Sequence, residues 1–223
     1  MNEFLTQLEK LLPLLLEGAV NTVSIFFLTL VIAIPFGLVI TLGSISRVPP
    51  LRWITNIYIW LFRGTPLMLQ LFFMYFFIPI VTKQTIMLSN FTTAAITFGL
   101  NYAAYFAEIY RGGIQSIDKG QHEAAKTLGF TRWQTMRHII IPQTIRRVIP
   151  ALSNEAITLV KDTALINVIG AMELLKQAKD WVNRTSDPTA YLFAAVFYLI
   201  FTFLLTLLSK KLEKIFSKHE VAI

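Results

Sequence analysis

Residues 18–46 read GAVNTVSIFFLTLVIAIPFGLVITLGSIS and contain no charged side chain over 29 consecutive positions. Two further runs without charge cover residues 84–107 and residues 188–209. A helix of about 20 apolar residues spans the hydrocarbon core of a bilayer, so each run is long enough to cross a membrane. Charged residues make up 15% of the chain, against about 25% in soluble domains. The chain is therefore predicted to be an integral membrane protein.

Two more stretches are long enough to cross a bilayer although they contain charges. Residues 53–82 are apolar except for Arg63, and residues 148–172 contain only three ionisable side chains. The first run is too long for a secretory signal and follows no short basic segment, so we expect no cleavage. The sequence thus predicts an all-α integral membrane protein, a five-helix bundle forming a single domain of residues 1–223, with spans at about 18–45, 53–81, 88–110, 144–170 and 188–209.

The net charge of +7 is distributed unevenly between the two sides of the predicted bundle. The loop at 46–52, the segment 111–147 and the tail after residue 209 share one side and carry 13 of the 20 Lys and Arg residues, whereas the opposite side carries five. Because basic residues concentrate on the cytoplasmic side of a membrane protein, the amino terminus is predicted to lie outside the cell membrane and the carboxyl terminus in the cytoplasm. The basic excess is read as a topology signal, and nucleic-acid binding is not expected.

The cytoplasmic segment 111–143 has the sequence pattern of two short helices. Asp118 can cap the first helix, and Gly129 stands where a left-handed residue would end it. Thr131 opens the T-x-x-Q spacing of a capping box for the second helix. Pro142 fits the first turn of the fourth span, where its missing N–H costs nothing. The pattern predicts helix, stop, helix rather than one continuous element.

The first of these short helices carries a small apolar face, formed by Ala124, Ala125 and Leu128 beside Glu123. A short helix with such a face is suited to a groove on another protein. The alternative is a solvated loop that only joins two spans.

The spacing in this segment resembles the EAA loop of membrane subunits of bacterial ABC importers. The pattern is E-A-A, three residues, Gly, nine residues and I-x-[I/L]-P, represented here by Glu123, Ala124, Ala125, Gly129, Ile139, Ile141 and Pro142. Ile141 stands where the family usually has Leu. Three other stretches resemble the polar amino-acid branch of these permeases, the histidine/glutamine/arginine permease-like family: FRGTPLMLQLFF (62–73), AYFAEIYRGGIQSIDKGQ (104–121) and VKDTALINVIG (160–170). The resemblance covers nearly the whole chain and implies the fold of a type I importer permease.

The resemblance also implies a function and a set of partners. The chain would be the permease subunit of an ATP-driven importer of polar amino acids and not itself an enzyme, with the EAA loop docking into a cleft of a cytoplasmic ATPase. The family combines two permease subunits, identical or paralogous, with two ATPase copies and an extracellular substrate-binding protein. No cofactor is expected in this chain, and ATP and Mg²⁺ would bind to the ATPase, because the chain has no G-x-x-x-x-G-K-[ST] loop.

The alternative function is a channel or secondary transporter that works without an ATPase. That class predicts internal inverted repeats and no docking loop. No repeat is evident in the sequence, and the docking loop is present.

Polar side chains inside the spans point to a substrate path. Charged groups are costly in a bilayer and usually face a cavity or each other. At helical spacing these stripes comprise Arg63 and Gln70 in the second span, Asn101, Tyr105 and Glu108 in the third, and Asn154, Glu155, Thr158, Lys161 and Asp162 in the fourth. The residues expected to bind substrate are Asp162, Glu108, Asn101, Arg63, Lys161 and Glu155.

An amino acid brings an ammonium and a carboxylate, so its cavity needs both an acceptor and a donor. Asp162, in the outer half of its span, is expected to accept the ammonium group, and Glu108 lies toward the inner half. The alternative is that these groups only pair with one another, for example Arg63 with Glu155 or Lys161 with Asp162.

Three further points follow from the sequence. Cysteine is absent and the three histidines lack ligand spacing, so no metal site is expected. The external segment 171–189 has helical character and either contacts the binding protein or caps the bundle. The transported amino acid and the identity of the second permease subunit are left open.

Overall fold

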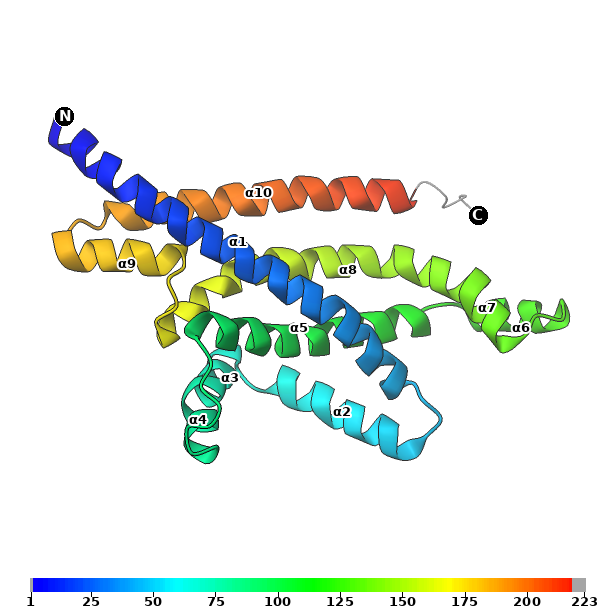
Figure 1. The fold of residues 1–223 in the computed structure, drawn as a ribbon. Helices are drawn as coiled ribbons and strands as arrows, with labels where there is room; N and C mark the ends of the chain where they lie inside the picture. Colours follow the sequence, from blue (N-terminus) through cyan, green and yellow to red (C-terminus); the bar gives the residue numbers. More distant parts are fainter. Residues whose placement is uncertain (1, 218–223) are drawn as a thin grey trace.

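The computed structural model describes the backbone of residues 2–217 and the side chains of residues 7–216. Throughout this part the chain is helical, without a strand (Figure 1). The helices are α1 (Asn2–Ser44), α2 (Pro49–Gly64), α3 (Leu67–Phe72), the π-helical turn η1 (Phe73–Phe77), α4 (Ile78–Val81), α5 (Asn90–Gln115), α6 (Lys119–Thr127), α7 (Arg132–Thr135), the π-helical turn η2 (Met136–Ile140), α8 (Ile141–Asp162), the 3₁₀ helix η3 (Thr163–Ile169), α9 (Leu174–Thr185) and α10 (Thr189–Ser217).

Helical segments occupy all five predicted spans. By length and composition alone, α1 over Gln7–Ser44 and α10 over Thr189–Phe216 can cross a membrane, and the bent pair α2 and α3–α4 can form a third span. The helices α5 and α8 have 26 and 22 residues, or about 39 and 33 Å at 1.5 Å per residue. These two helices carry the polar stripes.

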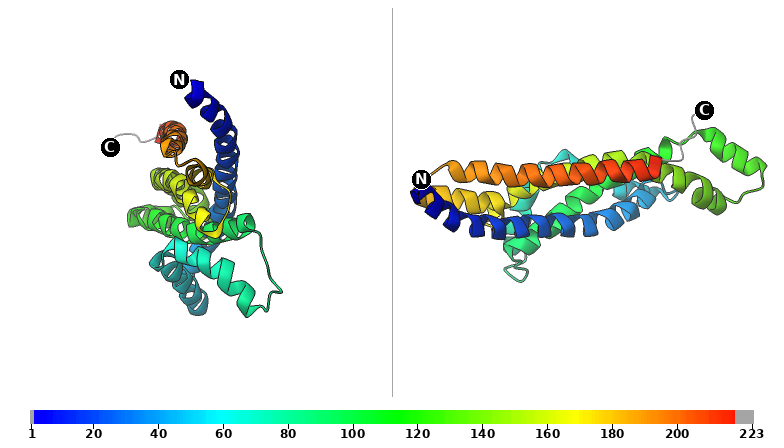
Figure 2. Two further views of the ribbon diagram at one scale, coloured as in Figure 1. Left: turned by 90° about the vertical axis from the view of Figure 1, so that its left-hand side faces the viewer. Right: turned by 90° about the horizontal axis from the view of Figure 1, so that it is seen from above.

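The core lies where α1 crosses α5 (Figures 1 and 2). Ala33 of α1 and Ala103 of α5 are fully buried, as is Ala107. Small side chains allow two helix backbones to approach closely within a membrane, where packing rather than water drives association. The Thr41 hydroxyl adds a link between the helices, since it donates to the Ala107 carbonyl at 3.1 Å. Helix α5 is the central helix, because it also packs against α2 and α8.

The second predicted span, 53–81, is not one helix. Helix α2 ends at Gly64, and the helix resumes at Leu67 after a bend of 106°. Thr65 between them is extended, with φ −117° and ψ 144°. Pro66 explains the break, because it has no N–H to donate and excludes the helical conformation from the residue before it. The segment α3–α4 therefore leaves the bundle sideways (Figure 1).

The fourth predicted span, 144–170, also changes character partway. The α-helix stops at Asp162, and a tighter 3₁₀ helix continues to Ile169. Gly170 then adopts the left-handed φ of +77° that ends the helix. The side chain of Asn90, at the start of α5, donates to the Ile169 carbonyl at 2.7 Å and holds this end in place.

The cytoplasmic segment contains the predicted local signals. The Asp118 side chain accepts from Gly120 N at 2.6 Å, Gly129 has φ +77°, and Thr131 forms a capping box. Pro142 lies in the first turn of α8. Helices α6 and α7 form a tip at one end of the molecule, opposite α9 and the start of α1 (Figure 1).

The predicted apolar face of α6 needs a correction. Ala125 is buried, with an exposed fraction of 1%, whereas Ala124 and Leu128 are exposed. The three residues therefore do not form one surface. Ala125 packs inward, and Leu128 lies on the outside with Phe130 and Trp133.

At the opposite end, α9 packs between α1 and α10 (Figure 2). Leu15, Leu174 and Ala190 are fully buried in this contact, together with Trp181. The predicted helical segment 171–189 thus covers that end of the bundle. The exposed side of α9 is polar, with Lys179 as an example.

Candidate functional site

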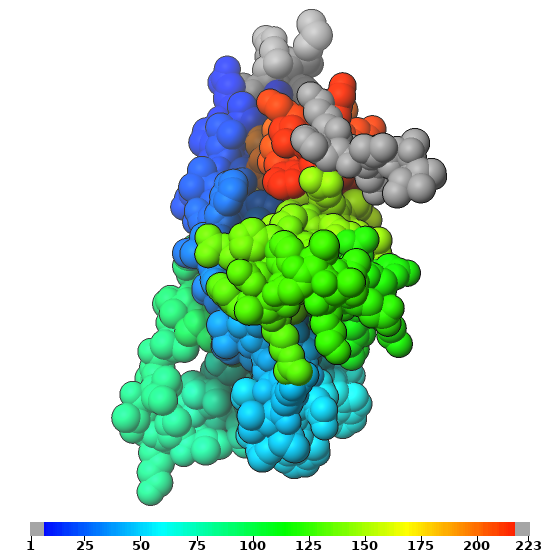
Figure 3. All heavy atoms as spheres, turned by 90° about the vertical axis from the view of Figure 1, so that its right-hand side faces the viewer, coloured from blue at the N-terminus to red at the C-terminus, as the bar shows by residue number. Residues whose placement is uncertain are grey.

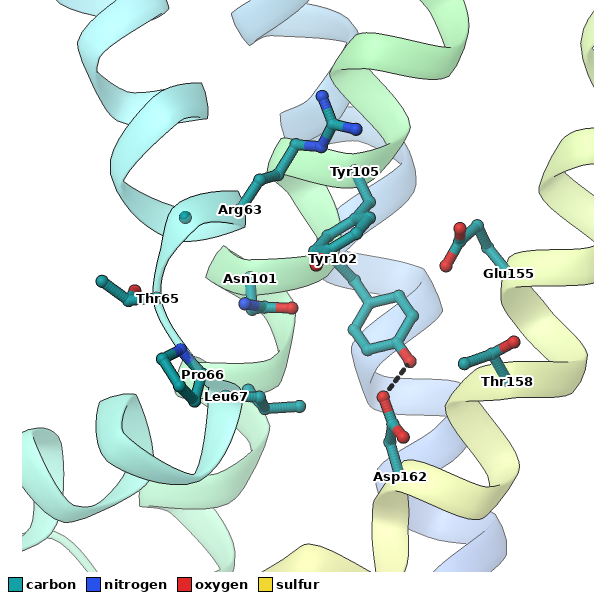
Figure 4. Close-up of a pocket in the computed structure, with 11 residues that line it drawn as sticks. Arg63, Thr65, Pro66, Leu67, Asn101, Tyr102, Tyr105, Glu155, Thr158 and Asp162 are labelled. Atoms are coloured by element: carbon teal, nitrogen blue, oxygen red, sulfur yellow. Dashed lines mark hydrogen bonds between the residues drawn. The ribbon is translucent and has the colours of Figure 1, made fainter.

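A cavity of about 420 Å³ opens at the break between α2 and α3 (Figure 4). The wall opposite the break is the last part of α8, and α5 forms the back. The lining residues are Arg63, Gly64, Thr65, Pro66, Leu67, Asn101, Tyr102, Tyr105, Glu155, Thr158 and Asp162. Two interrupted helices and the most buried helix of the fold therefore meet at this cavity.

The α8 wall is acidic. Glu155, Thr158 and Asp162 lie at positions i, i+3 and i+7, so one face of the helix presents all three. The Tyr102 hydroxyl of α5 donates to Asp162 Oδ2 at 2.7 Å and fixes the carboxylate across the cavity. Neither carboxylate forms an ion pair with a basic side chain in the described part of the chain. This wall offers acceptors to a positively charged group.

The basic group of the cavity is Arg63, in the last turn of α2. Its guanidinium lies over the Tyr105 ring, 5.4 Å from the centroid, and its Nη1 is 3.9 Å from Glu108 Oε1. Glu108 also accepts from Arg111 Nε at 3.0 Å, with a second, closer contact to Arg111 Nη2. Arg63 therefore pairs with Glu108 rather than with Glu155, so two of the predicted polar groups do pair with each other.

The break itself is held by two side-chain amides. Gln70 Nε2 donates to the Phe62 carbonyl at 2.9 Å, to the Thr65 carbonyl at 3.1 Å and to the Thr65 hydroxyl at 2.8 Å. Asn101 Nδ2 donates to the Phe62 carbonyl and to Gln70 Oε1, both at 3.0 Å. Gln70 was expected to share an inward stripe with Arg63, but the bend separates them and turns Gln70 back toward the break.

Four of the six predicted substrate-binding residues line the cavity: Arg63, Asn101, Glu155 and Asp162. Glu108 lies beside the cavity as the partner of Arg63. Lys161 is exposed outside the lining, and so is Asn154. The alternative pairing of Lys161 with Asp162 is not present as an ion pair within the described residues.

Sequence reasoning missed Tyr102 and the backbone of Gly64–Leu67. Tyr102 lies next to Asn101 and three residues before Tyr105. This position indicates that the polar stripe of the third span also includes Tyr102. The RGTP stretch (63–66) resembles a family motif, and its Pro66, which can kink a span, marks the break of 106°. Within the described residues, no three His, Cys, Asp or Glu side chains are grouped so as to hold a metal ion.

A second candidate surface lies on the tip formed by α6 and α7. Leu128, Phe130 and Trp133 are exposed there, with exposed fractions of 73%, 39% and 67%. Figure 3 looks onto this end and shows the tip in front of the rest of the molecule. Glu123 is exposed on α6. Exposed apolar groups gathered on one surface are typical of a contact site for another protein.

Comparison with known proteins identifies the class to which this fold belongs. Residues 33–218 match the model of the family described as binding-protein-dependent transport system inner membrane component. The chain belongs to this family.

Individual relatives agree with this assignment. The L-cystine transport system permease protein TcyB of Bacillus subtilis (strain 168) is 38% identical, over 91% of this chain and 86% of that protein. The arginine transport system permease protein ArtQ of the same organism is 37% identical, over 91% and 92%. The crystal structure of an amino acid ABC transporter with histidines contains a similar chain, with a TM-score of 0.87, 35% identity and coverage of 94% and 97%.

These comparisons confirm the predicted fold class and the predicted resemblance to permease subunits of ABC importers. The chain is a transport subunit and not an enzyme. The alternative of a channel or secondary transporter has no support among these relatives.

Proposed function

We propose that this chain carries a polar amino acid through the cavity between the α2–α3 break and α8. The observation that carries the proposal is the juxtaposition of the two unpaired carboxylates of Glu155 and Asp162 with the guanidinium of Arg63. An amino acid presents one ammonium and one carboxylate, and the cavity offers groups for both. The relatives named for cystine and arginine transport support a substrate of this class.

The residues take different roles in this proposal. Asp162 accepts the ammonium group, with Tyr102 holding the carboxylate in place, and Glu155 adds a second acceptor. Arg63 binds the carboxylate, while Glu108 holds Arg63 over the Tyr105 ring. Lys161 lies outside the lining, so it contributes its charge at a distance rather than a direct contact.

The test is Asp162→Asn, which keeps the shape of the side chain and removes its charge. Truncating one partner of a desolvated charged contact typically costs about 2–5 kcal/mol, or about 30-fold or more in affinity. We expect the dissociation constant of radiolabelled amino acid, measured on the purified permease–ATPase complex, to rise at least tenfold. Asp180→Asn removes a carboxylate that pairs with Lys176 on α9 and is the matched control. An unchanged constant in an assembled Asp162→Asn complex would remove Asp162 from the site.

The second part of the proposal concerns coupling. The segment with Glu123, Ala124, Ala125 and Gly129, followed by Pro142, docks into a cleft of a cytoplasmic ATPase subunit. The exposed Leu128, Phe130 and Trp133 at the tip support this role. Two ATPase copies, which bind ATP and Mg²⁺, would move two such tips together. Copurification with an ATP-binding protein that is lost when Trp133 is replaced by Glu tests the contact.

The assembly is completed by a second permease subunit, identical or paralogous, and by an extracellular substrate-binding protein. In the proposed orientation the amino terminus and α9 lie outside, and the α6–α7 tip and carboxyl terminus lie in the cytoplasm. The opposite placement of α9 and the tip in Figure 1 supports termini on different sides. Closure of the ATPases would then rock the bundles and alternate access to the cavity by rigid-body movement.

A further inference from the structure

The hydrogen bonds at the α2–α3 break fix which atom of each amide faces which partner. The carbonyl oxygens of Phe62 and Thr65 can only accept, so the group that lies 2.9 and 3.1 Å from them must be the nitrogen of the Gln70 amide. Gln70 Oε1 then faces away from the break, toward α5. The two carbonyl acceptors alone therefore determine the orientation of the Gln70 amide.

The same logic fixes Asn101. Its amide nitrogen lies 3.0 Å from Gln70 Oε1 and 3.0 Å from the Phe62 carbonyl, two atoms that only accept. Asn101 must therefore direct its nitrogen to the break and its carbonyl oxygen away from it. Figure 4 shows that oxygen pointing into the space between the break and α8. The side chain is otherwise enclosed, with an exposed fraction of 3% for the residue.

Gln70 reaches this position from behind the cavity. It lies one turn after Pro66, and side chains on a helix point back toward its amino terminus, so the amide extends over the break. Gln70 does not line the polar cavity. It lines a separate apolar hollow of about 370 Å³ together with Leu69, Phe73 and Thr97.

We propose that Gln70 is a positioning residue for substrate binding, which clamps Thr65 to the end of α2 and holds Asn101 with its oxygen in the cavity. This inference rests on the proposed function of that cavity. Gln70 acts through Asn101 and the break, without touching substrate. Asn101 consequently presents its carbonyl oxygen, an acceptor, to the cavity. The acceptors on α8, Glu155 and Asp162, therefore face a further acceptor on α5. The part of the ligand that enters between α5 and α8 is then a hydrogen-bond donor.

The experiment is a double-mutant cycle on the dissociation constant of the purified permease–ATPase complex. The probe is whichever of L-arginine, L-glutamine and L-cystine the wild-type complex binds best. Gln70→Met keeps the length of the side chain and removes every hydrogen bond, and we expect the constant to rise at least fivefold. Asn101→Ala should raise it at least as much. If Gln70 acts through Asn101, the double variant binds no worse than Asn101→Ala within a factor of two, because coupled residues are not additive.

The matched control is Thr97→Val. Thr97 lines the same apolar hollow, and its hydroxyl donates to the Thr93 carbonyl of its own helix, so the constant should change less than twofold. If Gln70→Met does not assemble, Gln70→Leu replaces it, since leucine also forms no hydrogen bond to Phe62, Thr65 or Asn101. The same rise and the same non-additivity are expected.

The outcomes separate the two proposals. Unchanged binding in the assembled Gln70 variant, or effects that multiply in the double variant, overturns the positioning role while the cavity stands. If Asn101→Ala and Asp162→Asn both bind the amino acid normally, the proposed cavity fails as well.

Discussion

Glu173 gives the bundle a pH dependence that can be measured. Its side chain has no exposed surface and caps α9, accepting from Leu175 N at 2.7 Å and Lys176 N at 2.6 Å. The Tyr198 hydroxyl of α10 donates to the same carboxyl group at 2.9 Å. Burial raises the pKa of Glu173 to about 7, against the opposing effect of the bonds from Leu175, Tyr198 and Lys176.

The sign of the effect follows from this raised pKa. Below a pH of about 4.5 the carboxyl is protonated in the folded and unfolded chain, and it contributes no pH dependence. Between about 4.5 and about 7 the unfolded chain loses the proton and the folded chain keeps it. The free energy of unfolding therefore falls by about 1.4 kcal/mol per pH unit, about 3 kcal/mol in all. Above pH 7 the loss is complete.

The perturbation is Glu173→Gln, which keeps the shape and cannot ionise. The variant loses one capping acceptor, a cost that does not vary with pH. We expect the thermal midpoint of the detergent-solubilised wild type, minus that of the variant, to fall between pH 5 and pH 7.5. At about 2–4 °C per kcal/mol for a chain of this size, the fall should be about 6–12 °C. Asp180→Asn controls for the loss of one carboxylate from α9. A difference that is constant with pH would refute the raised pKa.

Three further predictions concern packing, coupling and orientation. Gly113→Ala should lower the thermal midpoint, because its methyl group would lie 2.2 Å from an α8 side chain. Gly112→Ala is the control and should leave the midpoint unchanged, because its methyl group meets nothing within 4 Å. Equal midpoints for the two variants would contradict the packing of α5 against α8. Gly129→Val should reduce transport severalfold in an assembled complex, because valine is strained at φ +77°, and normal uptake would remove the coupling role. A cysteine at Lys179 should react with an impermeant reagent in intact cells, whereas one at Lys119 should not, and the reverse pattern would invert the proposed orientation.

Local signals predicted the cytoplasmic tip well because caps depend on nearest neighbours. A side-chain oxygen at Asp118 or Thr131 satisfies amides two or three residues away, and Gly129 is required by its own φ. The direction of Ala125 could not be predicted in the same way. A nine-residue helix has apolar residues on more than one side, and tertiary contact decides which of them is buried.

The residues that line the cavity were predicted less sharply because the stripe on α8 was drawn too wide. At 100° per residue, Glu155, Thr158 and Asp162 fall within about 60° of one another, and all three line the cavity. Lys161 is about 120° from Glu155 on the same wheel, and it is exposed. A limit of about 60° on either side of Glu155 would have kept Thr158 and Asp162 and left Lys161 out. Tyr102 escaped notice because an aromatic residue in an apolar run normally indicates core.

In both predicted spans that contain an interruption, the α-helix ends at the cavity. Hydrophobicity predicts that residues 53–82 form an apolar span. It carries no information on the helical hydrogen bonds that are lost at Thr65 and Pro66, in the middle of this span. In a bilayer such free backbone groups are tolerated only where protein or a cavity satisfies them. Here the amides of Gln70 and Asn101 bind the carbonyls that the break releases. The interruption is stable because side-chain amides of the site bind these free carbonyls. A polar residue one turn after a proline in an apolar span is therefore the sequence signal that would have located the cavity.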